Sequence, residues 1–250
     1  MSMEQYFFEA FEGMKRLGPG SKESTLKAAA LYPVRNAPVN ILDVGCGVGA
    51  HTFQLAQLLP MAEITAIDNN PAHIAEFQKT AELSGLSMRV KGAVMSMFEM
   101  TFADESFDLI WAEGSIYIAG FTNGIRDWKR LLKTDGYLIC SEISWLVDHP
   151  SEKCRQYWSE AYAEMDSVAN KLEQIKSAGY IPQESFVCPP SDWTENYYDL
   201  LQANLHRIEK KYSKHTEAMG VVKMLQEEID LYRQHGNEYS YVFYVMKKIG

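Results

Sequence analysis

The chain has 250 residues, of which 46% are hydrophobic and 23% are charged, an ordinary composition for one globular domain with additions. Its 24 basic and 33 acidic residues give a formal net charge of −9, and no basic run is present. Because nucleic acid binding needs a concentrated positive surface, this charge argues against a nucleic acid partner. No stretch approaches the ~20 apolar residues of a membrane span, so we expect no membrane partner either.

The four cysteines are widely scattered, at Cys46, Cys140, Cys154 and Cys188. No two form a Cys-x-x-Cys pair, so the pattern predicts no metal site and no disulfide framework. The first residues lack a basic segment followed by an apolar run, so we expect no signal peptide. These features predict reduced thiols and a cytoplasmic protein that is a monomer or a homodimer.

Residues 1–39 are predicted to form a helical arm that acts as a lid. Apolar side chains at helical spacing predict a helix over 3–16. The turn Gly18-Pro-Gly-Ser21 follows, and its serine can cap a second helix over 22–31.

From residue 40 onward, apolar strands alternate with amphipathic helices. The strands are predicted over residues 40–44, 63–68, 88–94, 107–113 and 137–141. Such alternation is typical of a parallel sheet with helices on both faces. We therefore predict an α/β fold with a Rossmann-like, doubly wound sheet.

After residue 144 the pattern changes to long helical segments. We interpret residues 40–250 as one domain with helical insertions at about 146–170 and 192–235. The last segment, 239–246, is β-rich, and we expect it to add an antiparallel strand to a mostly parallel sheet.

The most informative segment is the glycine-rich turn after the first strand. Residues 41–49 read Ile-Leu-Asp-Val-Gly-Cys-Gly-Val-Gly, so a buried strand leads into three alternating glycines and then a helix. Glycine is needed where a backbone turns sharply or where a ligand approaches closely. In a doubly wound sheet, this turn lies at the carboxyl ends of the strands, where ligands bind.

Asp68 ends the second predicted strand, where a carboxylate can accept hydrogen bonds from both hydroxyls of a ribose. We expect it to face an open cleft and to support little packing. The spacing of Gly45, Gly47 and Ala50 also fits a dinucleotide-binding turn, so spacing alone does not choose the nucleotide.

Three segments of the sequence indicate which nucleotide cofactor the glycine turn binds. They are Asp43-Val-Gly-Cys-Gly-Val-Gly49, Thr101-Phe-Ala-Asp-Glu-Ser-Phe-Asp-Leu-Ile-Trp111 and Leu131-Leu-Lys-Thr-Asp-Gly-Tyr137. In this order they resemble class I S-adenosylmethionine-dependent methyltransferases that act on small molecules, including the quinone-biosynthesis type. The resemblance covers about residues 40–145. It implies S-adenosylmethionine as the cofactor and a small molecule as the methyl acceptor.

The resemblance also implies which residues contact the cofactor: Asp43, Gly45, Cys46, Gly47, Asp68, Asn69, Ser96, Met97, Glu113 and Gly114. The glycine turn would pass under the methionyl part, and Asp68 would hold the ribose. Ser96 and Met97 would lie beside the adenine, although the family usually has an acidic residue at the first of these positions. Glu113 could attract the cofactor's amino group or sulfonium, because opposite charges attract strongly in a partly dry site.

The expected acceptor contacts are Tyr6, Tyr117, Glu142 and Trp145. A sulfonium methyl is already electrophilic, so no fixed catalytic residue is required unless the acceptor must lose a proton. We leave the catalytic residue unassigned. The candidates for such a base are Glu113, Glu142 and His149.

Two other functions stay open. The spacing Tyr244-x-x-x-Lys248 occurs in some NAD(P)-dependent oxidoreductases, but it works on a helix, and in a strand four residues span about 13 Å. The other is a non-catalytic module that binds S-adenosylmethionine. Nicotinamide binding would indicate the first function, and a failure to produce S-adenosylhomocysteine with any acceptor would indicate the second.

Overall fold

The computed structural model describes residues 2–34 and 36–249. In these residues eight strands form one mixed sheet, in the order β3-β2-β1-β4-β5-β8-β7, with β6 paired to β5 off this path. Neighbours from β3 to β5 are parallel, whereas β8 runs antiparallel to both β5 and β7. The strands are β1 (Val39–Val44), β2 (Ala62–Asp68), β3 (Val90–Val94), β4 (Phe107–Glu113), β5 (Leu132–Trp145), β6 (Asp166–Ser167), β7 (Tyr180–Val187) and β8 (Tyr239–Lys248).

The central strands are apolar on both faces because helices cover both sides of the sheet. In β4, Leu109 and Trp111 pack into one hydrophobic core, whereas Ile110 and Ala112 pack into the other. All four side chains are fully buried. The sheet is therefore the middle layer of three, as in the predicted doubly wound fold, which is confirmed.

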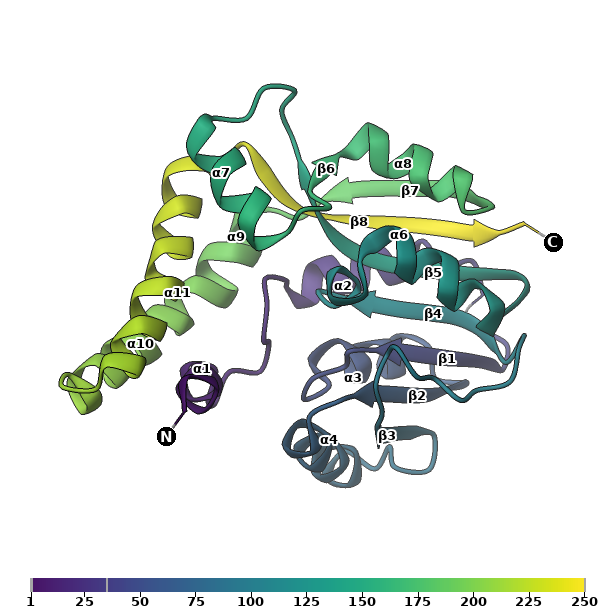
Figure 1. The fold of residues 1–250 in the computed structure, drawn as a ribbon. Helices are drawn as coiled ribbons and strands as arrows, with labels where there is room; N and C mark the ends of the chain where they lie inside the picture. The colour runs from purple at the N-terminus through teal and green to yellow at the C-terminus, as the bar shows by residue number, and fades with distance from the viewer. Residues whose placement is uncertain (1, 35, 250) are drawn as a thin grey trace.

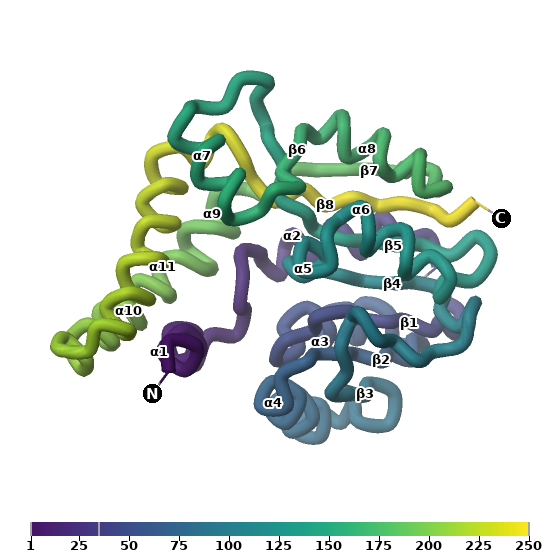
Figure 2. The backbone as a smooth tube through the Cα atoms, in the orientation of Figure 1, coloured from purple at the N-terminus to yellow at the C-terminus, as the bar shows by residue number. Residues whose placement is uncertain are grey.

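One face of the sheet is covered by α2 (Lys22–Ala30), α3 (Ala50–Leu58) and α4 (Pro71–Leu83), whose apolar residues belong to the first core. The other face is covered by α5 (Ile116–Ala119), α6 (Phe121–Asp127), a 3₁₀ turn (Trp128–Leu131) and α8 (Val168–Ser177), which build the second core. Figures 1 and 2 show these layers around the sheet.

A group of helices, here called the cap, stands beyond the carboxyl ends of β1 and β4 (Figure 1). Its members are α1 (Met3–Ala10), α7 (Glu152–Ala161), α9 (Pro190–Trp193), a π-helical turn (Thr194–Tyr198), α10 (Asp199–Tyr212) and α11 (Thr216–His235). The Asn204 side chain donates to Ala10 O (2.8 Å), and Lys211 pairs with Glu9 (2.9 Å). The amino-terminal arm is thus fastened to the late helices of the chain.

Three elements differ from the sequence predictions by more than two residues. The first helix ends at Ala10 instead of residue 16, because the chain then crosses from the cap toward the sheet (Figure 2). The helical insertion expected at about 146–170 contains α7 and the start of α8, separated by an extended stretch that contains β6. The fifth strand begins at Leu132 instead of residue 137, because Leu132 pairs with Phe107 across a bulge. No helix in the described part of the chain is long and apolar enough to span a bilayer.

Candidate functional site

A cavity of about 1090 Å³ lies between the carboxyl ends of β1, β2 and β4 and the cap. Its sheet side is lined by nine of the ten residues that the resemblance implied for the cofactor: Gly45, Cys46, Gly47, Asp68, Asn69, Ser96, Met97, Glu113 and Gly114. The topology explains this convergence, because parallel strands bring their carboxyl ends to one edge of the sheet.

The glycine turn is held against the neighbouring strand. The amides of Gly45 and Cys46 both donate to Ile67 O, at 2.9 and 3.0 Å. Gly45 has a φ of +76°, and a Cβ there would overlap the side chain of Ser115. Glycine at this position is therefore required by the turn and its packing, in addition to any ligand that lies above it.

Asp43, the tenth residue, does not line the cavity. Its side chain is fully buried beneath the turn, where it accepts hydrogen bonds from Thr52 Oγ1 (2.5 Å) and His51 Nε2 (3.1 Å). Burial alone would lower the pKa of His51, but the adjacent Asp43 carboxylate outweighs this effect and raises it. Asp43 supports the start of α3 from below, and the expected direct contact with a cofactor is not supported.

Asp68 lines the cavity and also supports the loops around it. Its Oδ2 accepts from Gly47 N (2.9 Å), and its Oδ1 accepts from Asn70 N (2.9 Å) and from His73 Nδ1 (3.3 Å). Burial alone would raise the pKa of Asp68, but these hydrogen bonds outweigh burial and lower it. The expectation that Asp68 has little structural role is therefore corrected.

The segment after β3 forms the wall where the adenine was expected. Met95 N donates to Asp68 O (3.0 Å), and Ser96 Oγ accepts from Phe98 N (3.2 Å). These bonds fix a tight turn whose Ser96 and Met97 border the cavity. Asn69 reaches the same wall from the end of β2.

Glu113 borders the cavity, but its charge is already paired. Its carboxylate accepts from Arg16 Nη1 (2.5 Å), from Thr25 Oγ1 (2.9 Å) and from Trp111 Nε1 (3.3 Å). The Glu113 side chain is only 3% exposed. Arg16 neutralises this charge, which weakens the expected attraction of the cofactor's amino group or sulfonium to Glu113. Sequence reasoning missed Arg16, since an isolated arginine in the arm gives no signal.

Of the expected acceptor contacts, Tyr117 lines the cavity and the other three do not. Tyr6 is buried inside the cap, where its hydroxyl shares a hydrogen bond with His215 Nδ1 (3.4 Å). Trp145 packs edge-on against Tyr239, with ring centroids 6.2 Å apart.

Glu142 points to the opposite face of the sheet, because successive side chains of a strand alternate and its neighbour Ile143 lines the cavity. Glu142 is fully buried and pairs with the equally buried Lys171 at 2.7 Å. His149 also lies outside the cavity, so among the candidate bases only Glu113 borders it.

Sequence reasoning missed most of the far wall of the cavity, which the cap and β8 supply. It is rich in aromatic side chains, and the residues used below are Tyr157, Trp158, Tyr197, Glu228 and Tyr241. They come from α7, the π-helical turn, α11 and β8. Because these segments are far apart in the chain, no local pattern joins them.

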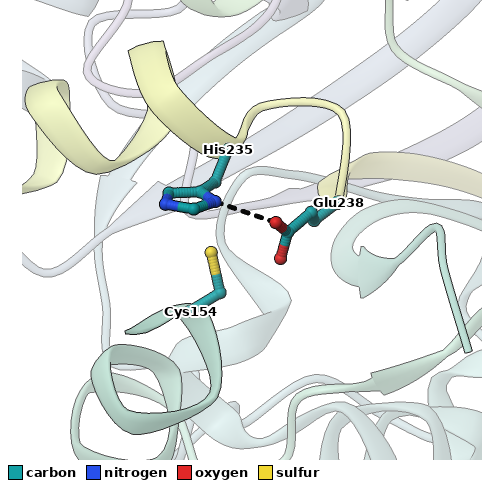
Figure 3. A group of neighbouring side chains, drawn as sticks. All are labelled: Cys154, His235 and Glu238. Carbon is teal, nitrogen blue, oxygen red and sulfur yellow. Dashed lines mark hydrogen bonds and ion pairs between the residues drawn. The ribbon is translucent and has the colours of Figure 1, made fainter. Parts of the chain in front are cut away.

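A second group of polar side chains lies outside the cavity and consists of Cys154, His235 and Glu238 (Figure 3). Glu238 accepts from His235 Nδ1 (2.8 Å) and from Ser151 N (2.8 Å). Burial raises the pKa of the Cys154 thiol to about 11, so it stays protonated at neutral pH. These hydrogen bonds act as a clasp between the start of α7, which Ser151 caps, and the turn before β8, which contains Glu238.

The Tyr244 and Lys248 pair does not reach the cavity. Tyr244 is buried and hydrogen bonds to Ser144 Oγ (2.8 Å), and Lys248 donates to Leu132 O (2.6 Å). Both residues belong to β8, so their spacing does not place them together on a helix face.

Comparison with curated proteins gives distant relatives. Sterol 24-C-methyltransferase erg6 of Aspergillus fumigatus is 26% identical over 152 residues, which are 57% of this chain and 40% of that protein. Phosphoethanolamine N-methyltransferase 1 of Arabidopsis thaliana is 26% identical over 175 residues, or 70% of this chain and 34% of that protein. The chain thus matches well under half the length of these relatives.

Solved structures share the whole fold. A SAM-dependent methyltransferase from Geobacter sulfurreducens in complex with S-adenosyl-L-homocysteine has a TM-score of 0.83 at 18% identity, with 97% of both chains covered. YjhP from E. coli has a TM-score of 0.84 at 19% identity, with 97% of this chain and 98% of that chain covered. At this identity the likeness establishes the fold. A family model for a methyltransferase domain matches residues 36–216, which include the glycine turn and the ends of β2 and β4. The chain therefore belongs to this methyltransferase domain family.

Proposed function

We propose that this protein transfers a methyl group from S-adenosylmethionine to a small-molecule acceptor. The observation that carries the proposal is a two-sided cavity in a methyltransferase domain. One side is built by the glycine turn and the strand ends, and the other is built by aromatic residues of the cap. A nucleotide-sized cofactor and a second small molecule can therefore lie side by side.

The residues on the sheet side fit this cofactor. Gly114 borders open space, since an added Cβ there would meet no atom within 4 Å. Asp68 is already oriented by Gly47 and Asn70, and its remaining lone pairs can accept the ribose hydroxyls. Ser96 and the backbone of Met97 would contact the adenine.

Arg16 extends the proposed site beyond the residues that the resemblance implied. Its guanidinium donates to Glu113, Thr25 and Gln54, and it has more N–H groups than these bonds use. We infer that the unused donors hold the carboxylate of the methionyl part, because arginine binds carboxylates well. Glu113 then orients Arg16 and keeps its charge balanced when the cofactor is absent.

The chain's own contribution to the reaction is positioning. When bound, the cofactor supplies a methyl group that is already electrophilic on its sulfonium sulfur. The cap and the strand ends hold the acceptor in line with that methyl and exclude water, which supplies much of the rate. No described residue is assigned as a base.

The proposal includes a cytoplasmic location and a monomeric or homodimeric state. The four cysteines are all buried and free, as expected for a protein of a reducing compartment. Size-exclusion chromatography with light scattering measures the oligomeric state, and a tetramer or larger assembly would contradict this part.

The test of function has two stages. Calorimetric titration should show micromolar binding of S-adenosylmethionine and S-adenosylhomocysteine and no binding of NAD or NADP. A second assay supplies methyl-labelled S-adenosylmethionine with a metabolite extract and follows the label into new products. Tight nicotinamide binding without a response to the sulfonium cofactor would overturn the proposal, and cofactor binding without any transfer would indicate a non-catalytic module.

A further inference from the structure

The far wall of the cavity contains a carboxylate that no cation neutralises. Glu228, on α11, lines the cavity and accepts hydrogen bonds from Tyr198 (2.9 Å) and Tyr157 (3.4 Å). Within residues 2–34 and 36–249, no lysine, arginine or histidine forms an ion pair with it. Of the other basic groups that border the cavity, Arg16 bonds to Glu113 and Lys211 bonds to Glu9, and the two histidines pair with aspartates. Lys15 of the arm also borders the cavity, but it forms no ion pair with Glu228.

The two tyrosine bonds do not replace a positive charge. Burial raises the pKa of Glu228, and the bonds from Tyr198 and Tyr157 offset that effect only in part. A carboxylate withdrawn from water is stabilised most by a cation that enters the same space. The cavity therefore favours a positively charged group next to Glu228.

The rings around Glu228 favour the same kind of ligand. Tyr157 and Tyr197 line the cavity beside it, and the negative charge of Glu228 raises the pKa of both hydroxyls together with burial. Tyr241 and Tyr117 line the same cavity, and burial raises the pKa of each hydroxyl, with the negative charge of Glu228 adding to that effect. Aromatic faces attract ammonium groups, and the attraction is strongest where water is excluded.

We propose that the methyl acceptor carries an ammonium group, which binds between Glu228 and the rings of Tyr117, Tyr157, Tyr197 and Tyr241. This inference rests on the proposed function, because it names the substrate class of the same cavity. It assigns Glu228 as a specificity-determining residue that touches the acceptor and leaves the cofactor side unchanged.

The test compares ligands that differ in charge but not in shape. The protein is saturated with S-adenosylhomocysteine and titrated with two matched pairs: choline with 3,3-dimethylbutan-1-ol, and 2-phenylethylamine with 2-phenylethanol. At neutral pH the first member of each pair is a cation and the second is neutral. We expect at least one cation to bind about tenfold or more tightly than its neutral partner, as ring and charge contacts together would give.

Two variants test whether Glu228 is the residue that causes the preference for the cation. Glu228→Gln keeps the shape and an acceptor for Tyr198 but removes the charge, and it should abolish the preference for the cation. Glu12→Gln is the matched control, because Glu12 borders the same cavity at its rim, where its side chain is 68% exposed. The control should keep the preference, and both variants should bind S-adenosylhomocysteine as the wild type does.

Three results would overturn the inference. The first is equal binding of both members of each pair, and the second is a cation preference that survives in Glu228→Gln. The third is that neither cation binds at concentrations up to about 10 mM, because a dissociation constant above that value would be too weak for specific recognition. If Glu228→Gln fails to fold, the comparison of ligands on the wild type still decides. A protein that does not bind S-adenosylhomocysteine at all fails the proposed function instead. Labelled products that are neutral or anionic would leave methyl transfer intact and refute only the ammonium acceptor.

Discussion

Replacing Asp68 with alanine should weaken both the loops around the cavity and the proposed cofactor contact. The carboxylate accepts two backbone amides at 2.9 Å, from Gly47 and Asn70. Bonds to a charged acceptor contribute about 1.5–3 kcal/mol each when buried, but water can solvate these amides in the open cavity. We therefore expect the free energy of unfolding without cofactor to fall by about 1–3 kcal/mol.

The effect on affinity should be separate from the effect on stability. Loss of the two proposed ribose bonds should weaken S-adenosylhomocysteine binding by about tenfold to several hundredfold, since each 1.4 kcal/mol is a factor of ten. Asp68→Asn should fall between, because an amide accepts a bond on one side but presents N–H donors on the other. Calorimetric titration measures the affinity, and urea denaturation measures the stability.

Asp108→Ala is the matched control for Asp68→Ala. Asp108 also accepts a backbone amide, from Asn40 (2.8 Å), and it pairs with Lys133, but it lies at the start of β4, away from the cavity. This variant should lose stability to a similar degree and keep its affinity. If Asp68→Ala binds S-adenosylhomocysteine normally while it melts early, Asp68 is only a structural residue and the placement of the cofactor is wrong.

Three further variants test the rest of the structure. Lys171→Met leaves Glu142 buried without its partner and should lower the free energy of unfolding by about 3–5 kcal/mol in urea denaturation, and the double variant with Glu142→Leu should recover most of the loss. If Lys171→Met is as stable as the wild type, the buried pair of Lys171 and Glu142 does not stabilise the fold. Hydrogen bonds lower the pKa of Glu238 from 4.5 to about 2, against the opposing effect of burial, so its contribution to stability is present above pH 4.5 and is lost as the pH falls through about 2. Glu238→Gln should flatten that part of the pH dependence, and an unchanged profile would show that the clasp is unimportant. Arg16→Met should weaken S-adenosylhomocysteine binding by about tenfold or more, with partial rescue in Arg16→Lys, whereas unchanged affinity in both would remove Arg16 from the site.

The parts of the fold that follow local patterns could be predicted from the sequence. The bounds of β4 agree with the prediction, and those of β1 and β2 differ from it by one residue at one end. The start of β5 could not be predicted, because residues 133–136 read Lys-Thr-Asp-Gly, a typical turn. In the structure they form a bulge between Leu132, which pairs with Phe107, and Tyr137, which pairs with Leu109, and Asp135 in this bulge has a φ of +62°. The turn signal is thus correct locally, and only the pairing of Leu132 with the neighbouring strand extends β5 beyond it.

The sequence analysis wrongly expected Glu142 to face the cavity, and here too the local sequence does not contain the deciding information. Strand β5 is covered on both faces, and from Leu138 to Ser144 every residue is buried, so no alternation of polar and apolar positions shows which face is which. The sequence places Glu142 near the cavity along the strand, but only the register of the sheet reveals that Ile143 faces the cavity. Lys171, which neutralises Glu142, lies 29 residues further along and gives no signal in the sequence.

The two sides of the cavity also differ in which parts of the sequence form them. The cofactor side is local, because a short turn and the ends of consecutive strands create it, and these lie inside the matched region 36–216. Part of the acceptor side lies outside that region, because Glu228 and Tyr241 follow it. Arg16 of the proposed cofactor site precedes the region. In the sequence, Glu228 stands in an acidic stretch that resembles a solvated helix face, and packing of the buried Leu225 and Ile229 turns α11 so that this one carboxylate enters the cavity. Selectivity for the acceptor should therefore vary among members of the family with the last helix and the last strand, while the glycine turn and the strand ends of the cofactor side stay the same.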